Sequence, residues 1–262
     1  MEKHKLLKIL AIAQNVLKEC IRHKIFNILF IFAGALIGGS LLIEELSPGA
    51  EGRTFINVAY ANMELFGFLT VMLSIFIITF EEVEMRTLWL TITKPVSRTS
   101  YLLGKFFGIS LVLLLTMSVM FLVVFGLTLT GKVHLNINYL LVPAAMSLSL
   151  MMTAAFTITL ITIATNLPTG IIFSSLLFII GHLTEHLKSV IENPQTGIAA
   201  KTALALVYYL APNFELFNLK DKLYLAGGTF DPYYILQITL YAVLYVFAAL
   251  YIGIKAFKKK EF

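Results

Sequence analysis

Residues 81–105 read EEVEMRTLWLTITKPVSRTSYLLGK and form the one long charged segment between two strongly apolar runs. Residues 56–80 precede this segment, and residues 106–129 follow it without a charged side chain. A helix needs about 20 apolar residues to cross the hydrocarbon core of a bilayer, and both runs are long enough. We therefore predict that residues 81–105 form a polar connector between two membrane spans.

Pro95 divides this connector. Because proline lacks a backbone N–H and restricts Lys94 to extended conformations, it ends any helix that comes before it. Ser97 and Ser100 follow as candidate caps for the next helix. The sequence predicts a short helix over residues 82–93, a turn, and a new helix that enters the membrane.

The composition is that of a polytopic membrane protein. The chain has 262 residues, of which 58% are hydrophobic and 13% charged. A soluble domain averages about 45–50% apolar and about 25% charged residues. The net charge of +5 fits basic cytoplasmic loops, so no nucleic-acid partner is expected. Cys20 is the single cysteine, which excludes an intramolecular disulfide and a cysteine-based metal cluster.

The apolar runs predict an all-α fold with six membrane spans. Residues 139–183 contain no Asp, Glu, Lys or Arg, and as one helix they would be about twice as long as the hydrocarbon core is thick. They must therefore hold two spans, with the break at residues 165–168, where Asn166 can cap and Pro168 suits a first helical turn. The predicted spans are 25–43, 57–80, 106–129, 139–165, 167–183 and 233–254.

Two further segments are predicted to be helical outside the spans. Residues 1–24 form a basic amphipathic helix, which we expect to lie in the plane of the membrane surface; the alternative is a soluble helix packed on a partner. Residues 184–232 form a mixed external segment between the fifth and sixth spans. Within this segment, residues 198–210 are apolar but too short for a span, and we expect a re-entrant or interfacial helix there.

The charge, proline and glycine pattern of the connector resembles the first cytoplasmic loop of type-2 ABC transporter permeases. The matching strings are E-x-E-x-R-T, K-P-V-S-R and L-L-G-K, which end at residues 87, 98 and 105. The resemblance implies that the connector docks in a groove of a separate ATPase subunit; the alternative is an ordinary basic loop with acidic caps. The residues to which it assigns this docking are Glu81, Glu82, Glu84, Arg86, Thr87, Lys94, Pro95, Ser97 and Arg98.

A second resemblance concerns the end of the chain. The string YYLAPNFELFNLKD at residues 208–221 and the tail KAFKKKEF resemble one permease subgroup, which includes the permease of the transporter that helps to mature nitrous oxide reductase. The family implies a permease homodimer that carries two ATPase copies. ATP and Mg²⁺ would bind in the ATPase, and this chain has no G-x-x-x-x-G-K-[ST] motif of its own.

The distribution of basic residues predicts the orientation. Of the 20 lysines and arginines, 14 precede the first span, lie in the connector or follow the last span. The other six fall in segments that six spans would place outside. This bias follows the positive-inside rule, so we expect both termini in the cytoplasm of a prokaryotic cell and the chain in its inner membrane.

Two candidate sites lie within the predicted spans. Glu64 is an ionisable residue in the second span and so a candidate intramembrane polar site, unless the span begins at Leu65 and Glu64 reaches water. Gly34 and Gly38 form a small-xxx-small pair that suits a dimer contact, although glycine is also simply common in membrane helices.

Three hydroxyl residues of the fourth span share a helical face: Ser149, Thr153 and Thr157. They are candidates for lining a polar path. Such hydroxyls more often bond to carbonyl groups of their own helix, and we expect that arrangement here.

The sequence His182-Leu183-Thr184-Glu185-His186 matches the inverted zinc-protease pattern H-x-x-E-H. On one helix, His182 and His186 would share a face and Glu185 could act as a base, but the sequence offers no third metal ligand. We therefore weigh three hypotheses: the permease subunit of an ABC exporter, a membrane anchor or assembly protein, and a membrane metalloenzyme. The permease explains the connector and the spans, and we adopt it.

Overall fold

The computed structural model describes residues 2–46, 51–84, 97–128, 137–164, 166–193, 197–220 and 231–259. All regular elements within these ranges are helical, which confirms the predicted all-α fold. The elements are α1 (Glu2–Arg22), η1 (Ile25–Asn27), α2 (Ile28–Leu46), α3 (Glu51–Glu84), α5 (Arg98–Thr128), η2 (Ile137–Leu140), α6 (Leu141–Ile163), α7 (Leu167–His182), α8 (Thr184–Glu192), α9 (Ile198–Leu210), η3 (Glu215–Phe217) and α11 (Pro232–Lys259).

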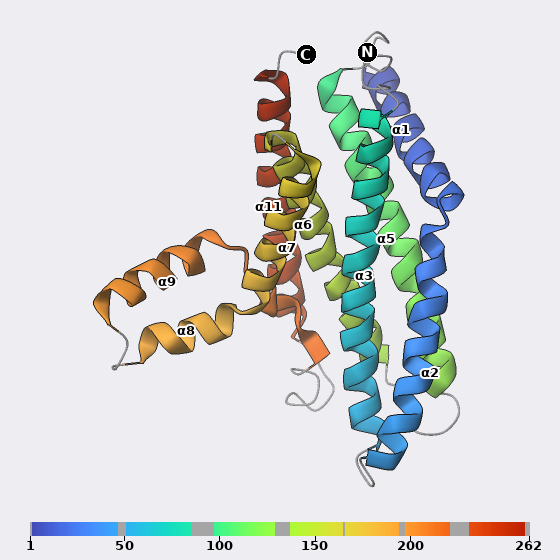
Figure 1. The fold of residues 1–262 in the computed structure, drawn as a ribbon, viewed down its shortest axis with the longest axis vertical. Coiled ribbons are helices and arrows are strands. Elements are labelled where there is room, and N and C mark those ends of the chain that lie inside the picture. The colour runs from blue at the N-terminus through green and yellow to red at the C-terminus, as the bar shows by residue number, and fades with distance from the viewer. Residues whose placement is uncertain are drawn as a thin grey trace.

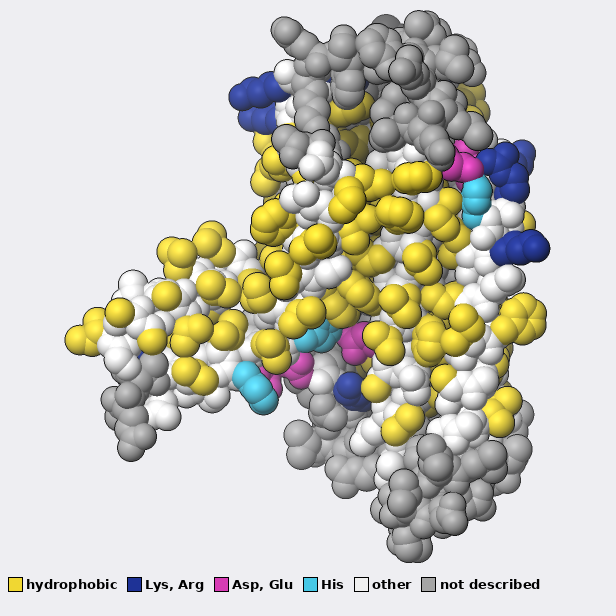
Figure 2. All heavy atoms as spheres, in the orientation of Figure 1, with side chains coloured by type: hydrophobic (Ala, Val, Ile, Leu, Met, Phe, Trp, Pro, Cys, Tyr) yellow, Lys and Arg dark blue, Asp and Glu magenta, His cyan; other side chains and the backbone are white. Residues whose placement is uncertain are grey.

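The long helices form one bundle, from which α8 and α9 project to one side as a hairpin (Figure 1). The start of α1 and the end of α11 lie at the same end of the bundle (Figure 1). Tyr60, Leu113 and Leu150 are among the fully buried side chains of the core and come from α3, α5 and α6. Large apolar side chains are also exposed along the bundle and the hairpin, which suits contact with lipid (Figure 2).

Four described helices are long and apolar enough to cross a membrane: α3, α5, α6 and α11. Two further candidates are bent pairs, with α1 and α2 at 54° and α7 and α8 at 58°. Counting each pair as one crossing gives six among the described residues, the number predicted from the sequence. The helix α7 has 16 residues, or about 24 Å, so it is shorter than the hydrocarbon core of about 30 Å.

The predicted break between the fourth and fifth spans is confirmed, since α6 ends at Ile163 and α7 begins at Leu167. Pro168 stands in the first turn of α7 as expected, but the Asn166 side chain makes no capping hydrogen bond. The backbone carbonyl of Asn166 accepts the Gly170 N–H instead, at 3.3 Å.

Helix α3 continues through Glu84, so the prediction of a separate helix that begins at residue 82 is wrong. The physical reason is that residues 81–84 contain neither proline nor glycine, and nothing there ends the helix. Helix α5 begins at Arg98, directly after the predicted cap Ser97. The predicted cap is confirmed, because the Ser100 N–H donates to the Ser97 hydroxyl at 3.1 Å. Residues 85–96 lie outside the described residues, and with them the predictions for Arg86, Thr87, Lys94 and Pro95.

The amphipathic helix α1 packs against the first half of α5. Its buried side chains include Ala13, Val16 and Cys20, whereas Leu6 and Leu10 are exposed. The apolar side of α1 is thus divided between a protein contact and an outward surface. In Figure 1, α1 slants alongside the bundle, and its position relative to a membrane surface stays a prediction.

Two glycines of α5 allow α1 to approach this closely. A Cβ atom at Gly104 would lie 2.7 Å from Ile12 Cβ, and one at Gly108 would lie 2.6 Å from Val16 Cβ. Gly34 and Gly38 of α2 differ from these two, because a Cβ at either position would meet nothing within 4 Å. That face is open within the described chain, and the dimer contact stays a prediction.

The α1–α5 contact can be tested with matched glycine substitutions. We expect Gly108→Ala to lower the free energy of unfolding by about 1–3 kcal/mol, because the methyl group overpacks the contact with Val16. In the same helix, a Cβ at Gly126 would meet nothing within 4 Å, so Gly126→Ala should be neutral or slightly stabilising. The measurement is thermal unfolding of the two purified variants in detergent, and equal melting temperatures would contradict the contact.

Candidate functional site

The base of the connector is held by ion pairs that begin at the last turn of α3. The Glu81 carboxylate lies 2.6 Å from His23 Nε2 and 3.3 Å from Arg22 Nη2. Both partners stand at the C-terminal end of α1 or directly after it. Glu81 therefore connects the C-terminal end of α1 to α3, the helix that leads into the connector.

Glu82, the next residue, connects α3 to α5. Its carboxylate accepts hydrogen bonds from Lys105 Nζ and from the Tyr101 hydroxyl. The Lys105 side chain is only 10% exposed, and its ammonium also lies 5.2 Å from the centre of the Tyr101 ring. A charge this deeply buried needs a partner, and Glu82 is the partner that α3 supplies.

Glu19 of α1 adds a third carboxyl to this region. The Asn15 amide donates a hydrogen bond of 2.7 Å to the same carboxyl. The base of the connector is thus an acidic cluster that basic groups from α1 and α5 offset.

Arg98, the first residue of α5, reaches the C-terminal end of α11. Its Nη1 donates to the carbonyl oxygens of Phe257, at 2.6 Å, and of Lys258, at 3.2 Å. The guanidinium also lies 5.6 Å from the centre of the Phe257 ring, and Tyr101 stacks on that ring at 5.9 Å. The last carbonyls of a helix have no donor within the helix, and a cation at this end interacts favourably with the helix dipole.

The structure therefore brings three of the predicted connector residues into interhelical contacts, namely Glu81, Glu82 and Arg98. A fourth, Ser97, caps α5. Glu84 lies in the last turn of α3, with its side chain outside the described part. The sequence did not identify the partners of these residues, because His23, Lys105 and the α11 carbonyls lie far along the chain or carry no local signal.

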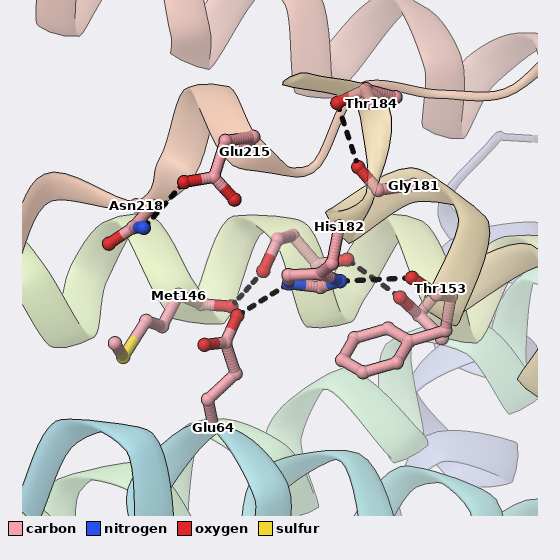
Figure 3. Close-up of polar contacts among 10 residues, drawn as sticks. Glu64, Met146, Thr153, Gly181, His182, Thr184, Glu215 and Asn218 are labelled. Carbon is pink, nitrogen blue, oxygen red and sulfur yellow. Dashed lines mark hydrogen bonds and ion pairs between the residues drawn. The ribbon is translucent and has the colours of Figure 1, made fainter. Parts of the chain in front are cut away.

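A second polar site lies where the hairpin meets the bundle. Glu64 of α3 points toward His182 at the end of α7, and Glu64 Oε1 lies 2.7 Å from His182 Nε2 (Figure 3). The two side chains are 21% and 24% exposed. Glu64 stands well inside the helix α3. Its depth in a membrane stays a prediction.

Both ring nitrogens of His182 lie within hydrogen-bond distance of an oxygen atom. Nδ1 lies 2.9 Å from the Phe178 carbonyl oxygen, which can only accept, so Nδ1 carries a proton. One further proton then lies between Nε2 and Glu64. The pair is therefore either imidazolium with carboxylate or imidazole with carboxylic acid, and in both forms the two groups satisfy each other.

Aromatic rings and a network of hydrogen bonds surround the histidine. The imidazole centre lies 4.3 Å from the Phe178 ring centre and 5.4 Å from that of Phe214. The Phe214 N–H donates to the Gly181 carbonyl at 3.0 Å, which fixes the segment after α9 against the end of α7. Nearby, the Thr184 hydroxyl donates to the Asn213 side-chain oxygen at 2.7 Å. Acidic, basic and histidine side chains gather on the visible face at this junction and beside α1 (Figure 2).

The structure separates the residues of the zinc-protease pattern. The chain bends by 58° between α7 and α8, so His182 and His186 do not share one helical face. His182 is occupied by Glu64 and Phe178, whereas Glu185 and His186 are exposed on α8. Within the described ranges, no group of three or more His, Cys, Asp or Glu side chains is placed to hold a metal ion.

The expectation for the α6 hydroxyls is confirmed. Ser149 donates to Met146 O at 2.8 Å, Thr153 to Ser149 O at 3.0 Å, and Thr157 to Thr153 O at 2.7 Å. These side chains are buried and bond to their own helix, so they do not line an open polar path.

An all-helical bundle with four to six apolar helices long enough to cross a bilayer, among the described residues, defines a polytopic membrane protein. Over residues 6–262 the chain matches the model of the ABC-2 family transporter proteins. The chain belongs to this family, and it is a transmembrane permease component of an ABC transporter. No curated protein matches it.

The buried pair at the base of the connector can be tested by removing one partner. We expect Glu82→Gln to lower the free energy of unfolding by about 3 kcal/mol, because Lys105 would remain buried without a counter-charge. The double variant Glu82→Gln with Lys105→Met should recover much of this loss. Thermal unfolding in detergent measures both effects.

The exposed pair Lys188–Glu192, at 3.9 Å, provides the control. Glu192→Gln should change stability by less than about 1 kcal/mol, since water already screens both groups. If Glu82→Gln behaves like Glu192→Gln, the pair with Lys105 is not a stabilising contact.

Proposed function

We propose that this chain is the permease subunit of an ABC exporter and that it couples to a separate ATPase subunit through residues 81–105. The observation that carries this proposal is the set of contacts at the base of the connector, where Glu81, Glu82 and Arg98 contact three other parts of the bundle. Contacts of this kind would let a displacement of the connector reach other helices of the bundle, as coupling to a partner requires.

The three contacts suggest how a movement of the connector would spread. A displacement at the end of α3 would reach α1 through Glu81 and α5 through Glu82. A displacement at the start of α5 would reach α11 through Arg98. Binding and hydrolysis of ATP in the partner would thus act on both the first and the last helix of the bundle, as well as on the two helices next to the connector.

The quaternary arrangement follows from the family resemblance. Two copies of this chain would pair and carry two ATPase subunits, with ATP and Mg²⁺ bound in the ATPases. The open face at Gly34 and Gly38 of α2 is a candidate for the contact between the two permeases. The basic ends of the chain support an inner-membrane location with both termini in the cytoplasm, and the string at residues 208–221 supports the subgroup named above.

The proposal is tested by purifying the tagged chain from its native membranes in a mild detergent and identifying the proteins that accompany it. We expect a P-loop ATPase in stoichiometric amount. Arg86→Glu should reduce the recovered ATPase by about tenfold or more, because a misplaced charge in a docking surface costs several kcal/mol.

Lys18→Glu is the matched control, because it reverses a charge on the exposed side of α1 at the same end of the bundle. This variant should retain the ATPase. Absence of an ATPase from the wild-type sample would contradict the permease function and favour the anchor or assembly role. Equal recovery with Arg86→Glu and Lys18→Glu would contradict docking through the connector.

A further inference from the structure

The side-by-side contact of α3 and α7 near the hairpin consists of two adjacent pairs of side chains. Glu64 meets His182, and one turn along each helix Phe68 stacks on Phe178 with ring centres 4.2 Å apart. The residue numbers rise along α3 from Glu64 to Phe68 and fall along α7 from His182 to Phe178, so the two helices are antiparallel at this point. We call these four residues the α3–α7 seam.

Outside the seam, α7 buries little. Of its 16 residues only Gly170, Ser174 and Gly181 are buried, and none of these has a large side chain. Gly170 lies against Ile161 of α6, and Gly181 lies against Phe214, so the two ends of α7 are held by close backbone approach. Between these ends α7 packs mainly on α6 and meets α3 over a smaller contact, which includes the seam.

The Glu64–His182 pair is chemically suited to a contact that opens and closes. A buried ion pair often stabilises a fold no better than apolar residues of similar volume, so its presence is better explained by specificity or switching than by stability. Charged groups that face it from the segment after α9 are Glu215 and Lys220, which influence His182 and Glu64 respectively. After separation, each side chain could therefore find other polar partners at this junction.

The pair also joins α3, which leads to the connector, to α7, which leads to the hairpin. Glu64 and Glu81 stand on the same unbroken helix, 17 residues or about 26 Å apart, so a tilt of α3 at the connector moves Glu64. His182 is the last residue of α7, directly before the bend that leads into the α8–α9 hairpin.

We propose that the Glu64–His182 pair is a latch that holds the α3–α7 seam closed, and that the pair separates during the transport cycle. The link to the cycle rests on the proposed function, whereas the latch itself rests on the contacts above. Separation would open the bundle between α3 and α7 beside the hairpin. Glu64 and His182 are thus positioning residues for transport, through the seam that they close.

The experiment measures the distance between spin labels on the two helices. Leu73→Cys on α3 and Leu176→Cys on α7 are both at exposed positions. They are introduced together with Cys20→Ala, which removes the single native cysteine, a buried one. The labelled protein is studied in lipid nanodiscs by pulsed electron paramagnetic resonance, first without nucleotide.

Without nucleotide, we expect one short distance in the labelled parent protein. Glu64→Ala and His182→Ala should each raise the population of a longer distance by about tenfold or more, since a hydrogen bond to a charged group is typically worth such a factor. Glu185→Ala, which removes an exposed acid on α8, is the matched control and should leave the distribution unchanged.

A metal-rescue variant separates a latch from a general loss of structure. Glu64→His would place two imidazoles across the seam, and these can share one Zn²⁺ ion. Without metal, Glu64→His should show the longer distance. Added Zn²⁺ should restore the short one, and EDTA should reverse this effect. The variant Glu64→His with His182→Ala should not respond to Zn²⁺.

The experiment tests the latch separately from its role in the transport cycle. If both alanine variants keep the short distance, or if Zn²⁺ does not restore it in Glu64→His, the latch is wrong whatever the partner is. If the ATPase co-purifies and ATP shifts the parent protein toward the longer distance, but not Zn²⁺-bound Glu64→His, the role in the cycle is supported. An ATP response that is equal in both would overturn that role. Failure to recover any ATPase would count against the proposed function and leave the nucleotide-free test of the latch intact.

Discussion

The rest of this structure depends on the cost of placing charge in an apolar bundle. A charged side chain that leaves water without a partner costs several kcal/mol. Each acid on α3 with a described side chain and a place next to another helix is accordingly met by a basic group: Glu64 by His182, Glu81 by His23 and Glu82 by Lys105. Because the partners come from three different helices, these pairs fix where α7, α1 and α5 lie relative to α3.

Close backbone packing is the second interaction that holds the helices together. Apolar side chains gain little from leaving lipid for protein, so membrane helices associate mainly by close packing and by polar contacts. Gly104 and Gly108 let α1 lie directly on α5, and Gly170 lets α7 turn back against α6. The charged pairs add polar contacts between helices at the base of the connector and at the α3–α7 seam.

Features of the fold that depend on neighbouring residues were predictable from the sequence, whereas features that depend on residues distant in the chain were not. The break between α6 and α7 was predictable because Pro168 acts on its own neighbours, and the Ser97 cap was predictable for the same reason. The continuation of α3 to Glu84 was not predicted, because the charged residues suggested a separate helix that begins at residue 82. Glu81 and Glu82 remain helical since groups distant in the chain satisfy their charges. The zinc-type spacing suggested that its two histidines lie on one helix, whereas the chain bends between them, directly after Gly181.

The amino-acid sequence by itself determined that this protein is an all-helical membrane protein, and roughly where its spans and its connector lie. Hydrophobic length and the positions of proline and charge are local properties, and the bilayer acts on them directly. Only the tertiary structure decided which charges meet. Glu64 and His182 are 118 residues apart, and no property of either residue indicates the other. Their contact exists because α3 and α7 pack antiparallel in the bundle, and pairing then removes the cost of burying both groups.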